Sequence, residues 1–524
     1  MSLQLSGGGN FTISLAGRPW LAGGEVRLGA HSSYAGSLVL TSAPKIHSGQ
    51  DALGVYESTT YSWALSSAEA KTIMTTSFRS YPSAEGAVVF EQSFPNDVPL
   101  DTVGAHLPSM GATIADGAGA AKSSEGAVTL FPGFIRGDGG PQDKLACASY
   151  HGVFPQVQAC TVPTYAESHQ GGVPLVIYNS TDAKLPMTIF SPLSTPKAQH
   201  MSTSADRFGA GVKATATSIP AGWTQTWILS GALGINAGYQ AWGDRVLAFS
   251  GKPRADKYKD VTHSTIGYWT DNGGYYHYST GDGSNRAKNG SYIYNHTYEE
   301  VLPKVKASHD AAGVPFGHWQ FDSWFYPKDG EVNGGGGGGG VTNWTADPAI
   351  FPSGMAAIDE ALGGMPMIMH NRQWSPISDY IHNLSFTWQS GGSSELCHGK
   401  CPWAVPDDAN AFFTWFFKQQ PGWGLTMYEQ DWMCTEYDGV QSLQTNLTLA
   451  DQWLAGMAAG ATTAGLAIQY CMPYAHDILA GSAHAAVTNA RATDDYFHGP
   501  LPGRGQWNIG GAECPGPPRP CRPR

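Results

Sequence analysis

The run Met427-Tyr428-Glu429-Gln430-Asp431-Trp432 combines a strand-like start with a carboxylate that stands beside an aromatic ring. A second run of the same kind, Arg491-Ala492-Thr493-Asp494-Asp495-Tyr496, lies farther along the chain. Each run predicts a strand that ends on an acid. Two acids at the ends of separate strands can serve a retaining glycosidase, in which one attacks the anomeric carbon and the other protonates the leaving oxygen.

From about residue 255 the sequence alternates candidate strands with candidate helices. The strands are expected at 264–270, 317–322, 365–370, 424–431, 465–471 and 487–494, and helices between them include 299–312, 353–362, 409–419 and 449–459. Repeated β-α units with functional groups at strand ends predict a (β/α)8 barrel of the TIM type over residues 255–507. An open, doubly wound sheet is the structural alternative, although no Gly-x-Gly-x-x-Gly turn follows the first strand.

Residues 1–245 show a different pattern, with short alternating segments separated by Gly, Ser, Pro and Asn. Examples are 11–15, 87–90, 174–178 and 224–229. Many short strands without a sustained helical period predict a β-sandwich domain. At the other end, residues 508–524 form a Pro/Arg-rich tail that we expect to be irregular, because proline interrupts both strands and helices.

The composition argues against several classes of partner. The chain has 524 residues, 14% of them charged, and a net charge of −12, whereas a nucleic-acid surface would be basic. We find no apolar run long enough to span a bilayer. Neither a His-x-His nor a His-Glu-x-x-His metal motif occurs, so we expect no metal ion and no other cofactor, and a metal-dependent hydrolase is a distant hypothesis.

Two features predict a secreted or lumenal protein, although no leader sequence is visible. Seven Asn-x-Ser/Thr sites make glycosylation an expectation; they lie at Asn10, Asn179, Asn289, Asn295, Asn343, Asn383 and Asn446. The cysteines allow disulfides between Cys397 and Cys401 and, as a weaker prediction, between Cys147 and Cys160. The alternative for Cys397 and Cys401 is half of a metal site.

Six segments, in chain order, resemble motifs of the clan of glycoside hydrolases that contains α-galactosidases and raffinose synthases (seed imbibition proteins). These segments are 268–276, 320–324, 351–355 with 367–370, 427–431, 468–473 and 491–496, the last of which resembles an Arg-Ala-Ser-Asp-Asp-Phe motif. The resemblance implies an N-terminal β-sandwich, a (β/α)8 barrel and a retaining reaction on α-linked sugars. It also implies two further barrel strands and a C-terminal β-domain, so we expect a barrel truncated at its C-terminal end.

The resemblance places Asp431 at the nucleophile position and Asp494 at that of the acid/base, with Asp495 as the alternative. Asp431 could instead be an ordinary acid that caps the following helix. Asp271 and Asp322 are candidate binders of sugar hydroxyls, or else solvated loop acids.

The remaining candidates each have a structural alternative. Three tryptophans (Trp269, Trp324 and Trp432) are candidate platforms for a sugar ring, or ordinary core residues. His370 could donate a hydrogen bond to the sugar, or be a satisfied core histidine. Arg491 could hold one acid ionised, or form a surface ion pair.

Two positions depart from the clan. Glu429 stands where a Lys commonly contacts the sugar hydroxyls, and Asp322 stands alone where the galactosidases have two acids in tandem. Glu429 either replaces that Lys or pairs with a cation of the barrel. Because both positions help to select the sugar, they put the galactoside preference in question.

The sequence therefore predicts a retaining glycoside hydrolase, similar to α-galactosidases, that acts on an oligosaccharide or glycoside. A transglycosidase of the raffinose-synthase type is one alternative. The other is a carbohydrate-binding or catalytically degenerate relative.

Overall fold

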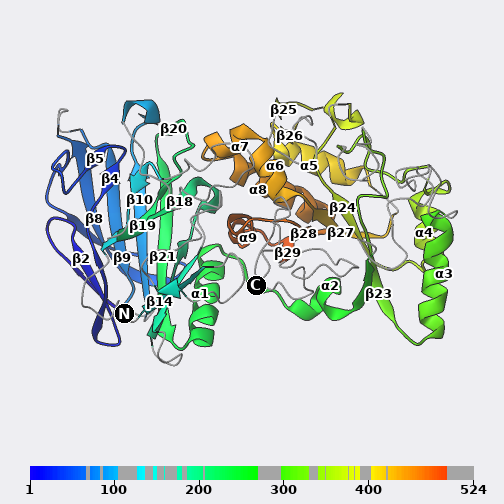
Figure 1. Ribbon diagram of the computed structural model, residues 1–524, viewed down its shortest axis with the longest axis horizontal. Coiled ribbons are helices and arrows are strands. Elements are labelled where there is room, and N and C mark those ends of the chain that lie inside the picture. Colours follow the sequence, from blue (N-terminus) through cyan, green and yellow to red (C-terminus); the bar gives the residue numbers. More distant parts are fainter. Residues whose placement is uncertain are drawn as a thin grey trace, which may run out of the picture. The chain divides into compact units, whose positions relative to one another are not determined.

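The computed structural model divides the chain into two compact units (Figure 1). Unit 1 comprises residues 1–254, 444–448 and 475–483; unit 2 comprises the rest. The structure describes residues 1–66, 71–82, 86–103, 127–135, 145–149, 158–159, 174–179, 186–203, 207–269, 297–329, 340–348, 350–375, 377–382, 384–389, 403–420 and 423–491.

Unit 1 is built from antiparallel sheets. In the described ranges, the smaller of the two main sheets has the order β1 (Ser2–Leu5), β2 (Phe11–Leu15), β3 (Arg18–Gly23), β13 (Gly133–Ile135), β19 (Arg207–Val212), β18 (Gln199–Thr203). The larger has the order β15 (Gln158–Ala159), β14 (Leu145–Ser149), β16 (Leu175–Asn179), β17 (Pro186–Pro192), β21 (Trp223–Leu233), β10 (Ala87–Phe94), β9 (Met74–Ser80), β8 (Gly54–Leu65), β6 (Leu38–Leu40), and β7 (Lys45–Asp51) also pairs with β8. Short pairings join β11 (Val98–Pro99) to β20 (Ser218–Ile219) and link β12 (Thr129–Leu130), β4 (Arg27–Leu28) and β5 (His31–Ser32).

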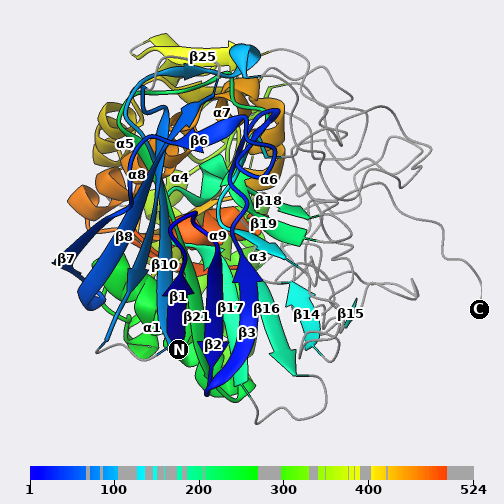
Figure 2. The same ribbon diagram turned by 90° about the vertical axis from the view of Figure 1, so that its left-hand side faces the viewer.

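The two main sheets share one apolar core, and Figure 2 shows β1, β2 and β3 in front of strands of the larger sheet. Alternate residues of β2 are buried, as expected for a strand with one face in a core. Phe11 of β2 packs against Phe78 of β9 with ring centroids 5.3 Å apart, and Phe134 of β13 packs against Phe190 of β17 at 5.1 Å. Unit 1 is therefore a sandwich of sheets, to which α1 (Ile235–Phe249) is added.

Residues 475–483 belong to unit 1 although the strands on either side of them in sequence belong to unit 2. They include the helix α9 (Ala475–Gly481), in which Asp477 pairs with Lys197. Both side chains are buried, so each charge offsets the desolvation of the other.

Unit 2 contains a parallel sheet in which six described strands follow one another in chain order. They are β22 (Ile266–Trp269), β23 (Phe316–Phe321), β24 (Met367–Asn371), β27 (Leu425–Gln430), β28 (Ala467–Tyr470) and β29 (Val487–Ala490). A doubly wound sheet reverses its strand order at a switch point, and this one does not, so that alternative is wrong for the described strands. The sheet corresponds to part of a barrel, and a closed eight-stranded barrel is not shown. The tail 508–524 lies outside the described residues.

The described helices of this half lie between the strands in sequence, except α2, which precedes β22. They are α2 (Val261–Ser264), α3 (Tyr298–Ala311), α4 (Gly354–Ala361), α5 (Ala409–Lys418), α6 (Met433–Gly439), α7 (Gln441–Thr445) and α8 (Leu449–Ala464), and a hairpin joins β25 (Phe386–Gln389) to β26 (Trp403–Pro406). No helix in these ranges is long and apolar enough to cross a membrane.

The helix α5 shows how the outer face of β27 is covered. Asp408 caps α5 by accepting the Ala411 N–H at 2.9 Å. The ring of Phe417 then packs 5.0 Å from that of Tyr428 on β27. Because successive residues of a strand point to opposite faces, Tyr428 turns toward the helices and its neighbours Glu429 and Asp431 share the other face.

Candidate active site

One face of the parallel sheet carries polar side chains in pairs spaced two residues apart, which places both members of a pair on the same face. The pairs are Gln320 and Asp322, Glu429 and Asp431, Gln469 and Cys471, and Asn489 and Arg491. In each pair the second residue follows the last residue of its strand. Since the strands are parallel, these second residues meet at the C-terminal edge of the sheet, where barrel enzymes place their active sites.

Asp431 is held in place by several donors. Its Oδ2 lies 2.9 Å from Nε2 of His370, and its Oδ1 accepts the Trp432 N–H at 2.6 Å. The thiol of Cys471 also hydrogen-bonds this carboxylate. Burial alone would raise the pKa of Asp431, but the hydrogen bond and charge of His370, the thiol and the Arg491 charge hold it below its usual range. Asp431 is therefore kept ionised, as a nucleophile requires.

His370 is bonded at both ring nitrogens. Nδ1 lies 2.8 Å from the hydroxyl of Tyr326, while Nε2 faces Asp431. Burial would lower the pKa of His370, but the charges of Asp322, Asp431 and Glu429 and the hydrogen bond to Asp431 outweigh it and raise the pKa. Of the two alternatives for His370, these contacts match the satisfied core histidine, which donates to or accepts from Tyr326 and Asp431.

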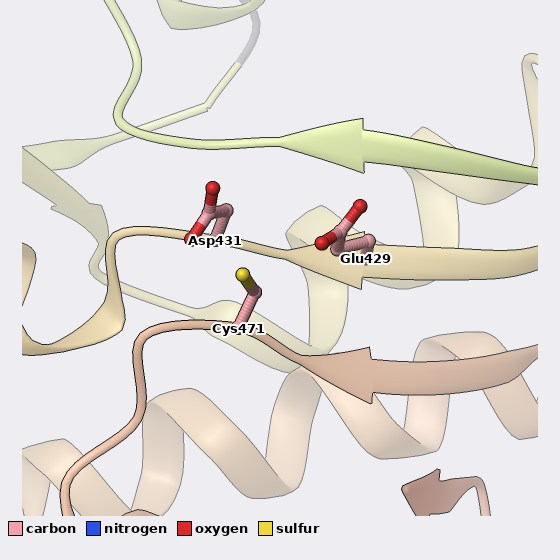
Figure 3. A group of neighbouring side chains, drawn as sticks. All are labelled: Glu429, Asp431 and Cys471. Carbon is pink, nitrogen blue, oxygen red and sulfur yellow. The ribbon is translucent and has the colours of Figure 1, made fainter. Parts of the chain in front are cut away.

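Glu429 is fully buried beside Asp431, and Figure 3 shows both carboxylates on the same side of β27. Its Oε2 accepts a hydrogen bond from Nε2 of Gln320 at 2.8 Å. Burial raises the pKa of Glu429 to about 7, and the charges of Asp431 and Asp322 act in the same direction, against those of His370 and Arg491. Two neighbouring carboxyls whose pKa values are moved in opposite directions are a common feature of acid/base sites.

Gln320 begins a chain of hydrogen bonds that crosses the sheet. Its Nε2 also donates to Oε1 of Gln469 at 3.0 Å, and Nε2 of Gln469 donates to Oδ1 of Asn489 at 2.7 Å. Nδ2 of Asn489 then donates to Oγ1 of Thr262 at 3.2 Å, and that hydroxyl donates to Oδ1 of Asp260 at 2.6 Å. The chain fixes the amide side chains that lie beside Glu429.

Cys471 and Arg491 complete the described edge of the site. Arg491 donates from its Nη1 to Sγ of Cys471 at 3.2 Å and lies 4.6 Å from the ring centroid of Trp269. Glu429, Asp431 and Cys471 each offer a ligand atom within 4.8 Å of the others, which is compatible in distance with a metal ion (Figure 3). The guanidinium beside the thiol opposes a cation there, because like charges repel at this range.

The three candidate tryptophans have different surroundings. Trp324 is fully buried, and its ring stacks 3.8 Å from that of Tyr298, which matches the core alternative; the sugar platform stays a prediction for it. Trp432 packs under the guanidinium of Arg372 at 4.3 Å, and Trp269 under that of Arg491. Either ring therefore has one face in contact with a cation.

Two left-handed backbone residues mark the edge of the site. Trp432 has a φ of 56° and Met472 a φ of 48°, and they directly follow Asp431 and Cys471. Such conformations cost about 1–3 kcal/mol in a residue other than glycine and cluster at functional sites. Here they turn the chain sharply away from the sheet just after the two side chains that meet.

Of the other candidates, Asp322 is buried and accepts the Ser323 N–H at 2.5 Å, so it is not a solvated loop acid. Outside the described residues lie Asp271, Asp494 and Asp495, and also the cysteines Cys160, Cys397 and Cys401. Of the cysteines whose side chains the structure describes, Cys434 of α6 is disulfide-bonded and Cys471 is free. The roles given to the three acids stay predictions.

Sequence reasoning missed Gln320, Tyr326, Cys471, Gln469 and Asn489. Gln320 and Asn489 carry a signal that was in the sequence, because each is a polar residue two positions before a candidate (Asp322 and Arg491). Gln469 and Cys471 have the same spacing from each other, but neither lies two positions from a candidate. Tyr326 follows β23 in a loop and has no such signal, because only the fold brings its hydroxyl to His370.

No family model and no curated protein matches the chain. Among solved structures it is similar to the GH36 α-galactosidase AgaA from Geobacillus stearothermophilus, with a TM-score of 0.49 and 11% identity over 86% of this chain and 61% of that one. It is also similar to a β-arabinopyranosidase (TM-score 0.43, 10% identity, 90% and 64% coverage) and to a xylosidase from Aspergillus niger (TM-score 0.41, 10% identity, 92% and 64% coverage). The chain thus spans less than two thirds of each of these glycoside hydrolases.

Proposed function

We propose that the protein is a retaining glycoside hydrolase that acts on α-linked sugars, with Asp431 as its nucleophile. The observation that carries this assignment is the surroundings of Asp431. A buried carboxylate at the C-terminal end of a parallel strand accepts hydrogen bonds from a histidine, a backbone N–H and a thiol, which keep it ionised. The motifs in register along the sequence support the class of reaction and the α-linkage.

The reaction would take two steps. The carboxylate of Asp431 attacks the anomeric carbon while an acid, Asp494 or its neighbour Asp495, protonates the departing oxygen, and a glycosyl ester forms. The same residue, now a base, then takes a proton from water as the water attacks the ester and releases the sugar. Each step inverts the anomeric carbon, so the configuration is retained overall.

A panel of 4-nitrophenyl α- and β-glycosides tests this function directly. We expect at least one α-glycoside to be hydrolysed, with the α-anomer of the sugar as the first product seen by NMR. Adding an alcohol acceptor shows whether the protein also transfers the sugar. Absence of turnover on every α-glycoside, or first release of the β-anomer, would contradict the proposal.

The His370→Gln change should move the acidic limb of the pH profile of kcat/KM to higher pH. Asp431 reacts only when ionised, hence above its pKa, and His370 lowers that pKa through its hydrogen bond and its charge. When the histidine is replaced, the pKa rises and ionisation requires a higher pH. The glutamine amide can still donate a hydrogen bond but carries no charge, so at a pH on that limb we expect kcat/KM to fall about tenfold for each unit by which the pKa rises.

A matched control for this change is His309→Gln on α3, where the histidine is half-buried and its Nδ1 lies 2.9 Å from the Val305 carbonyl oxygen. The control should keep the wild-type profile. An unchanged acidic limb in His370→Gln would exclude histidine as the group that keeps Asp431 ionised.

A further inference from the structure

The buried carboxylate of Glu429 has one oxygen without a partner. Oε2 accepts from Gln320, whereas Oε1 has no hydrogen-bond donor among the described residues, and Glu429 is 0% exposed. A buried acceptor without a donor costs about 1–3 kcal/mol, and more for a charged group. Such an atom in a native protein calls for an explanation, and one explanation is a ligand that supplies the donor.

The chain of amides determines which oxygen stays free. Asp260 anchors it, because the hydrogen bonds of Thr262 and Thr488 outweigh burial and lower the pKa of Asp260, which makes the carboxylate a pure acceptor. The hydroxyl of Thr262 must therefore donate to Asp260 and accept from Asn489.

The same logic runs back along the sheet. Because the NH2 group of Asn489 donates to Thr262, its oxygen accepts from the NH2 group of Gln469. The oxygen of Gln469 then accepts from Gln320. Gln320 thus directs its NH2 group to both Gln469 and Glu429. A donor always faces Oε2 of Glu429, so Oε1 is the free oxygen, and it accepts a hydrogen bond when the carboxyl is ionised.

We propose that Oε1 of Glu429 determines substrate specificity by accepting a hydrogen bond from a donor on the sugar that is bound at Asp431. This inference rests on the proposed function of the site. Glu429 lies on the same side of β27 as Asp431, with carboxylate oxygens within 4.8 Å (Figure 3). The donor is a hydroxyl or an ammonium group on the sugar, and a sugar without hydrogen on that atom, such as a deoxy or O-methyl sugar, is disfavoured.

The Glu429→Gln change reverses the polarity of the free atom. Gln320 still needs an acceptor, so the new amide turns its oxygen toward Gln320 and its NH2 group takes the place of Oε1. A sugar hydroxyl can accept from that group, because hydroxyls both donate and accept. An ammonium group cannot, because it only donates.

The experiment uses the 4-nitrophenyl glycoside that the wild type hydrolyses best, with its monodeoxy and monoamino derivatives at each ring position. In the wild type we expect one monodeoxy position to reduce kcat/KM by about 10- to 100-fold, the range for a hydrogen bond to a charged group. In Glu429→Gln that penalty should shrink to a few-fold if the natural donor is a hydroxyl. If the donor is an ammonium group, the wild type should hydrolyse the monoamino substrate with the higher kcat/KM, and the Glu429→Gln variant should lose this preference.

Glu360→Gln on α4 is the control, because Glu360 is exposed and is not one of the residues of the site. Penalties that are the same at every position in the wild type and in Glu429→Gln would overturn the inference while leaving the hydrolase assignment intact. If Glu429→Gln does not fold, the wild-type series decides alone, and the lack of any tenfold penalty overturns the inference.

If the wild type hydrolyses none of the glycosides, the proposed function fails and binding takes its place as the readout. Calorimetry with the free sugars and their monodeoxy derivatives then measures the same penalties as ratios of Kd. A dependence on Glu429 there sustains the inference without the hydrolase, and no dependence, or no binding, overturns it.

Discussion

The Asp431→Asn protein should fold normally and hydrolyse glycosides at least about a thousandfold more slowly than the wild type. The amide has the shape of the carboxylate but lacks the charge and the nucleophilic oxygen that attack the anomeric carbon. Its oxygen can still accept from His370 or from the Trp432 N–H, so the left-handed turn at Trp432 should persist. Steady-state kinetics with an aryl α-glycoside, together with thermal unfolding, check both parts of this expectation.

A chemical control separates a lost nucleophile from a damaged site. In Asp431→Gly, formate or azide can enter the space left by the side chain and attack in its place, so either anion should partly restore turnover. Asp310→Asn is the matched control: Asp310 is largely exposed on α3, where it pairs with Lys306, and the change should leave the rate unaltered. Wild-type rates in Asp431→Asn would remove Asp431 from the mechanism.

The strands of unit 2 were predictable because each is a short segment with its own local pattern, bounded by turn or helix residues. The expected strand 424–431 is observed as β27 (Leu425–Gln430), and 365–370 as β24 (Met367–Asn371). All five residues of β24 are buried, as are the last four of β27. Closure into a full barrel depends on partners distant in sequence, and local patterns carry no information about it.

The contacts within the site depended on register, which the sequence did not reveal. His370 is opposite Glu429 in the pairing of β24 with β27, yet its ring reaches forward to Asp431. The sequence showed that an acid, Glu429, stands two residues before Asp431. It did not show which oxygen of Glu429 is free, because the amide of Gln320 that bonds the other oxygen comes from another strand. Trp324 shows that closeness in sequence to a candidate acid does not decide the surroundings of an aromatic residue, because its ring stacks on that of Tyr298 in the core.

Three carboxyls compete for the role of acid/base. Asp494 and Asp495 are candidates from the sequence, and Glu429 now joins them, because burial raises its pKa to about 7 and it lies beside Asp431. A pKa near the working pH suits an acid that must also act as a base. Glu429, however, is on the same strand as the nucleophile and is bonded to Gln320, which suits a residue that binds the sugar better than one that reaches the leaving oxygen.

Asp494→Asn should therefore slow the hydrolysis of substrates with poor leaving groups by about 10²- to 10⁴-fold, the usual contribution of general acid catalysis. Methyl α-glycosides need a proton on the departing oxygen, whereas 2,4-dinitrophenolate leaves without one, so dinitrophenyl α-glycosides should lose little in the first step. The same pair of substrates is to be measured with Asp495→Asn and Glu429→Gln. A large loss of rate on the methyl glycoside with little loss on the dinitrophenyl glycoside should occur in one variant only. The residue replaced in that variant is the acid. A split in Asp495→Asn or Glu429→Gln would transfer the role to that residue, and equal losses on both substrates in Asp494→Asn would exclude it as the acid.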